Sequence, residues 1–236
     1  MVRVGQETSL IETRQFTPHL RCKRLGLRLR ENWENYLVYL KRELKGLSNG
    51  SSYTEVGSLM AASSINPLIM CKIIGDVVDP FVPTADMDVY YATKHVTNGC
   101  SIKPSMAFNP PTVTISGLPN ELYTLVMTDP DMPSPSEPSM REWVHWIVAN
   151  IPGGTNSGQG KEIVPYMEPC PAVGIHRYIL ILFRQSKYVD QTIEKPNIIT
   201  RANFNTRAFS HHLCLGFPVA IVYFNAQKEP INQRNV

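Results

Sequence analysis

Several common sequence signals are missing from this chain of 236 residues. Its five cysteines are odd in number and form no Cys-x-x-Cys pair or zinc-type spacing, so we expect reduced thiols and not a disulfide framework. No apolar run approaches the ~20 residues of a membrane-spanning helix. No apolar stretch near the N-terminus resembles a secretory signal. We therefore expect an intracellular protein with no transmembrane segment.

Basic charge is scarce where a nucleic-acid-binding surface would need it. Residues 1–59 contain ten Lys and Arg against six Glu, a net charge of +4, whereas residues 60–236 contain thirteen Lys and Arg against fourteen Asp and Glu, a net charge of −1. Domains that bind nucleic acid directly usually carry a basic excess. We expect no direct contact with nucleic acid, so any role in transcription would run through protein partners.

The sequence divides near residue 60. We expect residues 1–59 to be an N-terminal extension, partly helical over 20–47 or disordered, because Leu and aromatic residues recur there among many charges and a Ser- and Gly-rich linker follows at 48–52. A partner or membrane-surface helix, a transit peptide and a segment with no role remain open for it. Residues 60–236 have the composition of one folded domain, with many of the chain's nineteen prolines.

The domain has the pattern of a mainly β protein. A short helix is predicted from residue 66 to about 77, and another over about 205–214. Strands are predicted at 87–91, 112–116, 123–128, 144–149, 178–183 and 219–224, where apolar runs are separated by loops rich in Pro, Gly and Ser. The fold class that follows is a sandwich of antiparallel sheets with a few short peripheral helices.

The densest polar cluster lies at the ends of predicted strands. Asp129 and Asp131 follow the strand at 123–128, and His176 precedes the strand at 178–183. Alternation along a strand places Trp143 and His145 on one face. Carboxylates and imidazoles at strand ends are where a rigid sheet can hold a binding site.

This cluster predicts a pocket for an anion or a zwitterion. A carboxylate beside an imidazole favours the imidazolium. One or two such cations from His145 and His176, with the Tyr178 hydroxyl, would bind a phosphate or a phospholipid head group. A carboxylate or the ring of Trp143 could contact an ammonium group on the same ligand.

Three other interpretations of the cluster stay open. Two His and two Asp could bind a metal, although no dense ligand spacing such as His-Glu-x-x-His is present. An acid–base hydrolase would need a nucleophile, and neither a Gly-x-Ser-x-Gly nor a catalytic-Cys signature occurs; serines 134 and 136 fit turn positions. The residues could also be hydrogen-bonded core polar groups. We expect no metal, no cofactor and no catalysis.

Motifs over about residues 60–230 resemble the phosphatidylethanolamine-binding protein (PEBP) family. They are Asp-Pro-Asp-x-Pro (129–133), Arg-Glu-Trp-Val-His-Trp (141–146), Asn-Ile-Pro-Gly (150–153) and Gly-Ile-His-Arg-Tyr (174–178). Leu-Phe-Arg-Gln (182–185) and Ala-Asn-Phe-Asn-Thr-Arg (202–207) indicate the plant branch. Trp143 stands where flowering-promoting plant members carry Tyr and repressors carry His, which is similar to the third plant subgroup, that of Mother of FT and TFL.

The resemblance implies a PEBP-like β-sandwich and a non-enzymatic signalling regulator. The subgroup implies control of seed germination and dormancy through abscisic-acid and gibberellin signalling, with a role in flowering, in the cytoplasm and nucleus, through bZIP-type transcription factors. The alternative within the family is a phosphatidylethanolamine-binding lipid carrier or a membrane-associated inhibitor. The ligand-binding residues expected on these grounds are Asp129, Asp131, Pro133, Trp143, His145, Pro171, His176 and Tyr178.

The partner surface of the flowering activators carries over only in part. Their two basic contacts and one aromatic contact to 14-3-3 adaptors fall on Asn120, Tyr188 and Gln159, with Lys187 beside Tyr188, and only Pro152 matches. Losing such anchors weakens an interface considerably. We expect Pro152, Lys187 and the polar loop that begins at 186 and runs to about 200 to mark a partner surface, with 14-3-3 binding doubtful.

Overall fold

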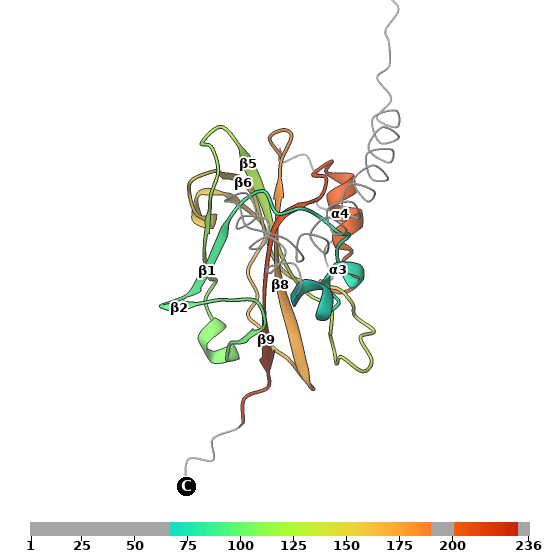
Figure 1. Cartoon of the computed structure of the whole chain (residues 1–236). Coiled ribbons are helices and arrows are strands. Elements are labelled where there is room, and N and C mark those ends of the chain that lie inside the picture. Colours follow the sequence, from blue (N-terminus) through green and yellow to red (C-terminus); the bar gives the residue numbers. More distant parts are fainter. Residues whose placement is uncertain (1–66, 190–200, 231–236) are drawn as a thin grey trace, which may run out of the picture.

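The computed structural model describes residues 67–189 and 201–230 (Figure 1). The predicted N-terminal extension, including its helical pattern, lies outside the described residues, as do residues 190–200 of the predicted polar loop. In the part of the chain that is described, no helix is long and apolar enough to cross a membrane.

Two β-sheets pack against each other. The larger sheet has the strand order β3-β9-β8-β5-β6-β7 and consists of β3 (Cys100–Ser101), β5 (Leu122–Asp129), β6 (Trp143–Pro152), β7 (Lys161–Val164), β8 (Ile175–Arg184) and β9 (Pro218–Gln227). The smaller sheet has the order β2-β1-β4 and consists of β1 (Met87–Tyr91), β2 (Lys94–His95) and β4 (Thr112–Ile115). Its pairs and most pairs of the larger sheet are antiparallel, while β3 runs parallel to β9. The predicted mainly β sandwich is confirmed.

All six predicted strands are present as β1, β4, β5, β6, β8 and β9. The central strands β5 and β8 are buried on both faces of the sheet. Their sequences are therefore nearly continuous in apolar residues. β2, β3 and β7 were not predicted. These strands have only two to four residues, most of them exposed or half-buried, and therefore carry no apolar pattern.

The helices are short and lie at the periphery. The helix predicted from residue 66 to 77 is wrong in its length: residues 67–70 are helical, and after a turn only α3 (Ile73–Asp76) follows. Lys72 and Gly75 have φ values of 55° and 106°, which interrupt a right-handed helix. The later helix is α4 (Thr206–His212), where the side chain of Asn205 accepts a hydrogen bond from the amide of Ala208. Two 3-10 turns, η1 (Pro104–Ala107) and η2 (Ser157–Gln159), are the other helical elements among residues 67–189 and 201–230.

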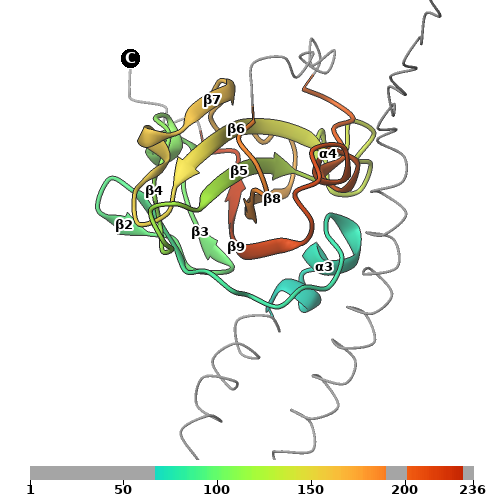
Figure 2. The same ribbon diagram turned by 90° about the horizontal axis from the view of Figure 1, so that it is seen from above.

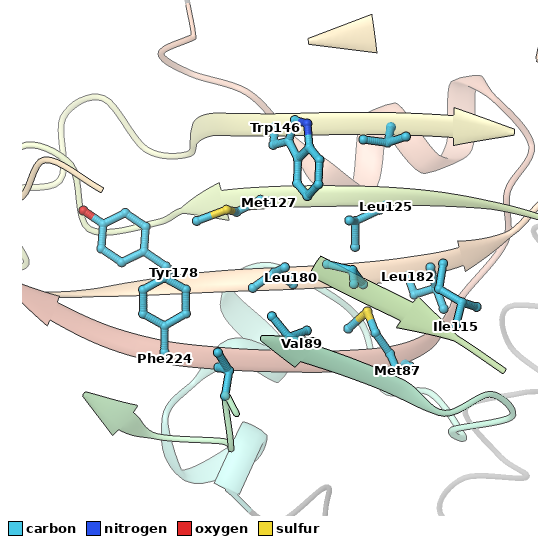
Figure 3. Packing of buried hydrophobic residues seen from close by; sticks show 14 of the residues in the cluster. Met87, Val89, Ile115, Leu125, Met127, Trp146, Tyr178, Leu180, Leu182 and Phe224 are labelled. Carbon is cyan, nitrogen blue, oxygen red and sulfur yellow. The ribbon is translucent and has the colours of Figure 1, made fainter. Parts of the chain in front are cut away.

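The six-stranded sheet has two differently covered faces (Figures 1 and 2). Its sandwich face packs on the three-stranded sheet through the buried residues Met87, Val89, Ile115, Leu125, Met127, Leu180, Leu182 and Phe224. Its helix face packs on the segment before β1 and on α4 through Leu68, Ile73, Phe81, Val126, Ile147, Ile179 and Phe183, with Phe209 partly buried. Figure 3 shows the sandwich face, with Tyr178 and Phe224 at one end of the cluster and Leu182 and Ile115 at the other.

An extra residue in β6 shapes the sandwich face near one end of the sheet. Met127 of β5 pairs with Trp146 and the next residue, Thr128, pairs with Val144, which leaves His145 with no residue opposite it. Such a bulge breaks the alternation of side chains. As a result His145, whose ring contacts Tyr178, and Trp146, which belongs to the core of the sandwich face, lie on the same side.

Candidate functional site

The predicted site residues meet at one end of the six-stranded sheet. Asp129 is the last residue of β5 and lies opposite Trp143, the first residue of β6. Because β8 is antiparallel to β5, its first residues, including His176 and Tyr178, lie at this same end. The fold thus brings together side chains that are far apart in the sequence.

The site contains a buried ion pair between His176 and Asp129. The Nδ1 atom of His176 lies 2.7 Å from Oδ2 of Asp129, and both side chains are inaccessible to solvent. The Nε2 atom of His176 lies 3.0 Å from the carbonyl oxygen of Val173. Both ring nitrogens therefore face acceptors, which requires both to carry hydrogen. Burial opposes the charge, but the hydrogen bond and the charge of Asp129 outweigh it and raise the pKa of His176. The two acceptors and the raised pKa favour the predicted imidazolium at this position.

His145 is in the opposite protonation state. Its Nδ1 atom lies 2.8 Å from the carbonyl oxygen of Met167, so Nδ1 carries the hydrogen and donates it. Burial lowers the pKa of His145 to about 4, and the imidazole is neutral at pH 7. Of the one or two histidine cations predicted, the structure provides one. The Nε2 atom of His145 is left as a buried acceptor with no partner among the described residues.

Two further polar atoms beside His145 also lack partners. The ring of Tyr178 packs edge-on against that of His145, with centroids 5.1 Å apart, and stacks on Phe224 at 5.3 Å. Within the described part of the chain, Nε1 of Trp143 and the Tyr178 hydroxyl are buried without a hydrogen bond of normal geometry, although the backbone amide of Cys170 faces the hydroxyl. Burial raises the pKa of Tyr178, so its hydroxyl keeps its hydrogen. Buried polar atoms without partners are uncommon in native proteins and indicate water or a ligand.

Asp131 belongs to the site's scaffold. Its Oδ2 atom accepts from the backbone amide and Nε of Arg177, at 2.8 and 2.9 Å, and Oδ1 accepts from Nη2 at 2.6 Å. Nη1 of Arg177 donates to the carbonyl of Cys71 at 2.6 Å. Asp131, predicted as a ligand residue, thus uses its carboxylate to hold Arg177, and its role toward a ligand stays a prediction. Arg177 was missed, although its place beside His176 in the Gly-Ile-His-Arg-Tyr motif was a usable signal.

The two prolines predicted for the site lie in its loops. Pro133 is half-buried and Pro171 is buried. The loops that carry them touch where a Cβ on Gly174, which has φ of 84°, would lie 2.9 Å from Cδ of Pro135. Glycine thus permits the close contact between the loops that border the site.

Pro152 and Lys187, predicted to mark a partner surface, lie at the other end of the sheet. Pro152 ends β6 and pairs with Leu122, while Trp143 begins β6. At about 3.3 Å per residue, the length of β6 separates them by about 30 Å. Lys187 is exposed, and its carbonyl accepts from Nε2 of Gln185 at 3.0 Å. The structure therefore keeps the ligand site and the predicted partner surface apart.

Two observations concern the alternative interpretations of the cluster. Within the described residues, no three His, Cys, Asp or Glu side chains are grouped so as to hold a metal ion. Ser134 accepts from the amide of Glu137 at 3.3 Å and lies 3.1 Å from the Ser136 hydroxyl, which is the turn role predicted for it.

Comparison with known proteins identifies the family. The family profile described as phosphatidylethanolamine-binding protein matches residues 84–224, and the chain belongs to this family. It is 53% identical to "Protein MOTHER of FT and TFL1 homolog 2" of Oryza sativa subsp. japonica over 174 residues, which cover 73% of this chain and 99% of the relative. It is 48% identical to "Protein TERMINAL FLOWER 1" and 46% identical to "Protein FLOWERING LOCUS T" of Arabidopsis thaliana, each over 72% of this chain and 95% of the relative. The plant branch predicted from the motifs is confirmed.

Solved structures show the same fold. The phosphatidylethanolamine-binding protein from Plasmodium vivax superposes with a TM-score of 0.58 and 25% identity, over 70% of this chain and 97% of that chain. A carboxypeptidase Y inhibitor, solved in complex with its cognate proteinase, superposes with a TM-score of 0.62 and 24% identity, over 72% and 97%.

Proposed function

We propose that this protein is a non-enzymatic signalling regulator that acts in seed germination and dormancy, within abscisic-acid and gibberellin signalling, and in flowering. Its relatives among plant proteins named for flowering support this role. The observation that carries the ligand-binding part is that three residues close to the Asp129–His176 pair each have a buried polar atom without a partner. We infer that this site takes a small anionic or phospholipid-head-group ligand.

The side chains of the site are poorly suited to catalysis. Both nitrogens of His176 donate hydrogen bonds, so this residue has no free lone pair with which to accept a proton. His145 has a free lone pair, but with a pKa of about 4 it is a weak base at neutral pH. The carboxylate of Asp129 accepts from His176 and from the amide of Asp131. A binding function accounts for this arrangement better than hydrolysis does.

Protein partners would act at the far end of the sheet. Pro152 is half-buried, and Lys187 and Tyr188 are exposed there, so this surface is available for contact. We propose bZIP-type transcription factors as the partners, in the cytoplasm and nucleus, with 14-3-3 adaptors bound weakly because Asn120 and Gln159 replace stronger anchors.

A second candidate function is a phosphatidylethanolamine-binding lipid carrier or membrane-associated inhibitor. Val173 and Ile175, on either side of Gly174 and next to His176, are 65% and 56% exposed. Apolar side chains exposed beside a head-group site would favour contact with lipid tails. Sedimentation with vesicles tests this candidate: a carrier should bind in proportion to phosphatidylethanolamine content, whereas a regulator need not.

Germination tests the regulatory role directly. Seeds that lack the gene should change their sensitivity to abscisic acid, and a wild-type copy should restore it. A copy with His176→Ala, or with the milder Tyr178→Phe, should restore it less well if the pocket is required. Unchanged germination in the mutant seeds would overturn the proposed role, whatever the pocket binds.

A further inference from the structure

A groove of about 310 Å³, referred to as the α4 groove, lies between α4 and the segment that precedes β1. Figure 2 shows α4 and α3, which belongs to that segment, on the same side of the six-stranded sheet. Val78 lines the groove from the segment, and Ala208 and His211 line it from α4. Apolar side chains where β8 ends and β9 begins also line it: Phe183, Phe217 and Pro218. The groove is therefore at the opposite end of β8 from the Asp129–His176 site.

The two walls of the α4 groove are tied together by Arg207. This side chain donates from Nε to Oδ1 of Asp79 at 2.9 Å, and from Nη1 and Nη2 to three backbone carbonyls of the segment before β1 at 2.7 to 3.1 Å. Gly216 also lines the groove, and a Cβ added to it would meet no atom within 4 Å, which shows open space there. The groove is preformed, and a preformed surface costs less free energy to fill.

The α4 groove has the apolar character of a helix-binding surface. Val78 and Phe183 are buried beneath it, and Phe217 is half-buried. The segment before β1 also carries three large apolar side chains that are exposed to solvent: Ile69, Met70 and Val82. Apolar grooves of this kind bind amphipathic helices, whose side chains at every third or fourth position enter the groove.

The chain itself contains a sequence of this kind in its N-terminal extension, which lies outside the described residues. A match of 174 residues covers 99% of the Oryza sativa relative, and the family motifs lie over about 60–230, so most of the extension has no counterpart in that relative. Residues 20–47 contain eight Lys and Arg against three Glu. Large apolar residues recur there every three or four positions, at Leu29, Trp33, Tyr36, Leu37, Leu40, Leu44 and Leu47. This spacing predicts one apolar stripe along a helix.

The extension joins the fold beside the α4 groove. The described fold begins at residue 67, and Leu68 belongs to the same buried cluster as Val78, which lines the groove. Residues 48–66 separate the stripe from this point, and a flexible chain of that length spans about 25 Å on average. Such a tether gives an effective concentration of about 1 mM. A helix that is marginal in isolation can therefore be held by a surface of modest affinity.

We propose that the predicted helix of residues 20–47 docks its apolar stripe in the α4 groove of the same chain. Side chains from the middle of the stripe, such as Trp33 and Leu40, fill the groove, while the basic residues on the other faces of the helix stay in water. The extension is then an internal partner of the domain. This contact does not involve the Asp129–His176 site, so it is independent of the ligand proposed for that site.

Hydrogen exchange of the full chain, followed by mass spectrometry, tests the proposal from both sides. Leu40→Glu places a charge in the middle of the stripe. Ala208→Glu places one in the groove, at an exposed position in the first turn of α4, where Glu is compatible with a helix. We expect Leu40→Glu to speed the exchange of the α4 amides, and Ala208→Glu to speed that of residues 27–45, each at least about tenfold. The double variant should exchange no faster than the single variants, because either change alone removes the contact.

Val38→Glu, on the opposite face of the predicted helix, is the matched control and should exchange like the wild type. Slow exchange in β5 and β8 verifies that the domain of each variant is folded. If residues 27–45 of the wild type exchange as fast as an unfolded chain, the proposal is overturned. Protection of these residues that Ala208→Glu leaves intact would also overturn it, because the stripe would then pack on another surface. Protection that falls on dilution would assign the stripe to a second copy of the chain and overturn docking within one chain.

Discussion

The two ends of the six-stranded sheet both hold buried polar side chains, but they use them differently. At the end away from the candidate site, Oε1 of Gln185 accepts from the Thr124 hydroxyl and from the amide of Asn150, both at 2.8 Å. Its Nε2 donates to Oδ1 of Asn150 at 2.8 Å and to the carbonyl of Lys187. Asn150 in turn binds the amide and carbonyl of Val189, each at 2.8 Å. Every side-chain nitrogen and oxygen of these two amides has a partner.

At the site end, an equally buried group is incomplete. Asp129 and His176 satisfy each other, while Trp143, His145 and Tyr178 each leave one atom unpaired. A completed network fixes the backbone around it, as Gln185 and Asn150 fix the start of the segment after β8. An incomplete one leaves buried polar atoms that water or a ligand has to satisfy. The contrast distinguishes a structural polar cluster from a functional one on the same sheet.

The largest expected effect is at the ion pair. Asp129→Ala would leave the His176 imidazolium buried without its partner, and we expect the free energy of unfolding to fall by about 3–5 kcal/mol. Urea denaturation measures it. The control is Asp79→Ala, which removes an exposed ion pair with Arg207 and should cost less than about 1 kcal/mol. Similar losses in both variants would mean that the buried pair is not special.

The second-largest loss of stability is expected at the hydrogen-bond network of Gln185 and Asn150. Gln185→Leu would leave the Thr124 hydroxyl and the backbone amide of Asn150 without an acceptor, while Oδ1 of Asn150 would keep only the amide of Val189 as a donor. We expect a loss of about 3 kcal/mol in urea denaturation, with Lys187→Ala near zero as the neighbouring control. A loss below about 1 kcal/mol would show that the network does not stabilise this end.

The protonation of His145 predicts a smaller, pH-dependent effect. Because its pKa is about 4 in the folded state and 6.5 ordinarily, the unfolded chain takes up a proton first as the pH falls, and folding loses about 2 kcal/mol between pH 6.5 and pH 5. His176 has a raised pKa, so its contribution is complete below its ordinary pKa and is lost only as the pH rises through its folded value.

Comparison with a variant isolates this effect. Urea denaturation of both proteins is measured at pH 7 and at pH 5. The wild type should lose stability at pH 5 through the protonation of His145, and the His145→Phe variant should lack this part of the loss. Glu142, whose pKa burial raises, is present in both proteins and cancels in the difference. An equal change in both proteins would contradict a buried, neutral His145.

Much of this could be predicted from the sequence, and the reasons for the rest are physical. The apolar runs of β5, β8 and β9 predicted a buried sheet, and the strand-end positions of Asp129 and His176 predicted their meeting. The sequence predicted one or two histidine cations but could not say which histidine stays neutral, because that depends on the acceptor each ring faces: Asp129 for His176 and the carbonyl of Met167 for His145.

Other features depended on contacts that leave no local pattern. The pairing of Asp131 with Arg177 joins β8 to a loop 46 residues earlier. Nothing in the local sequence indicates this contact, so Asp131 was predicted from its residue type to be a ligand group. The Gln185–Asn150 network joins two strand ends in the same way. The bulge at His145 was not predicted, yet alternation still placed Trp143 and His145 on one face, since the extra residue shifts the alternation only from Trp146 onward.

The smallest expected effect is at Tyr178. It separates the two ends of the sheet most clearly, because the substitution should not lower the free energy of unfolding as the others do. Tyr178→Phe removes only the hydroxyl, which is buried and has no partner within the described residues, so in the absence of ligand we expect the free energy of unfolding to stay the same or rise by up to about 1 kcal/mol. Tyr123→Phe is the matched control, since its hydroxyl donates to Glu121 at 2.7 Å, and it should lose about 1 kcal/mol. Thermal and urea denaturation of the two variants side by side would show the difference. If Tyr178→Phe instead lost as much as Tyr123→Phe, the hydroxyl would already be satisfied in the free protein, and the two ends of the sheet would differ less in their energetics than in their geometry.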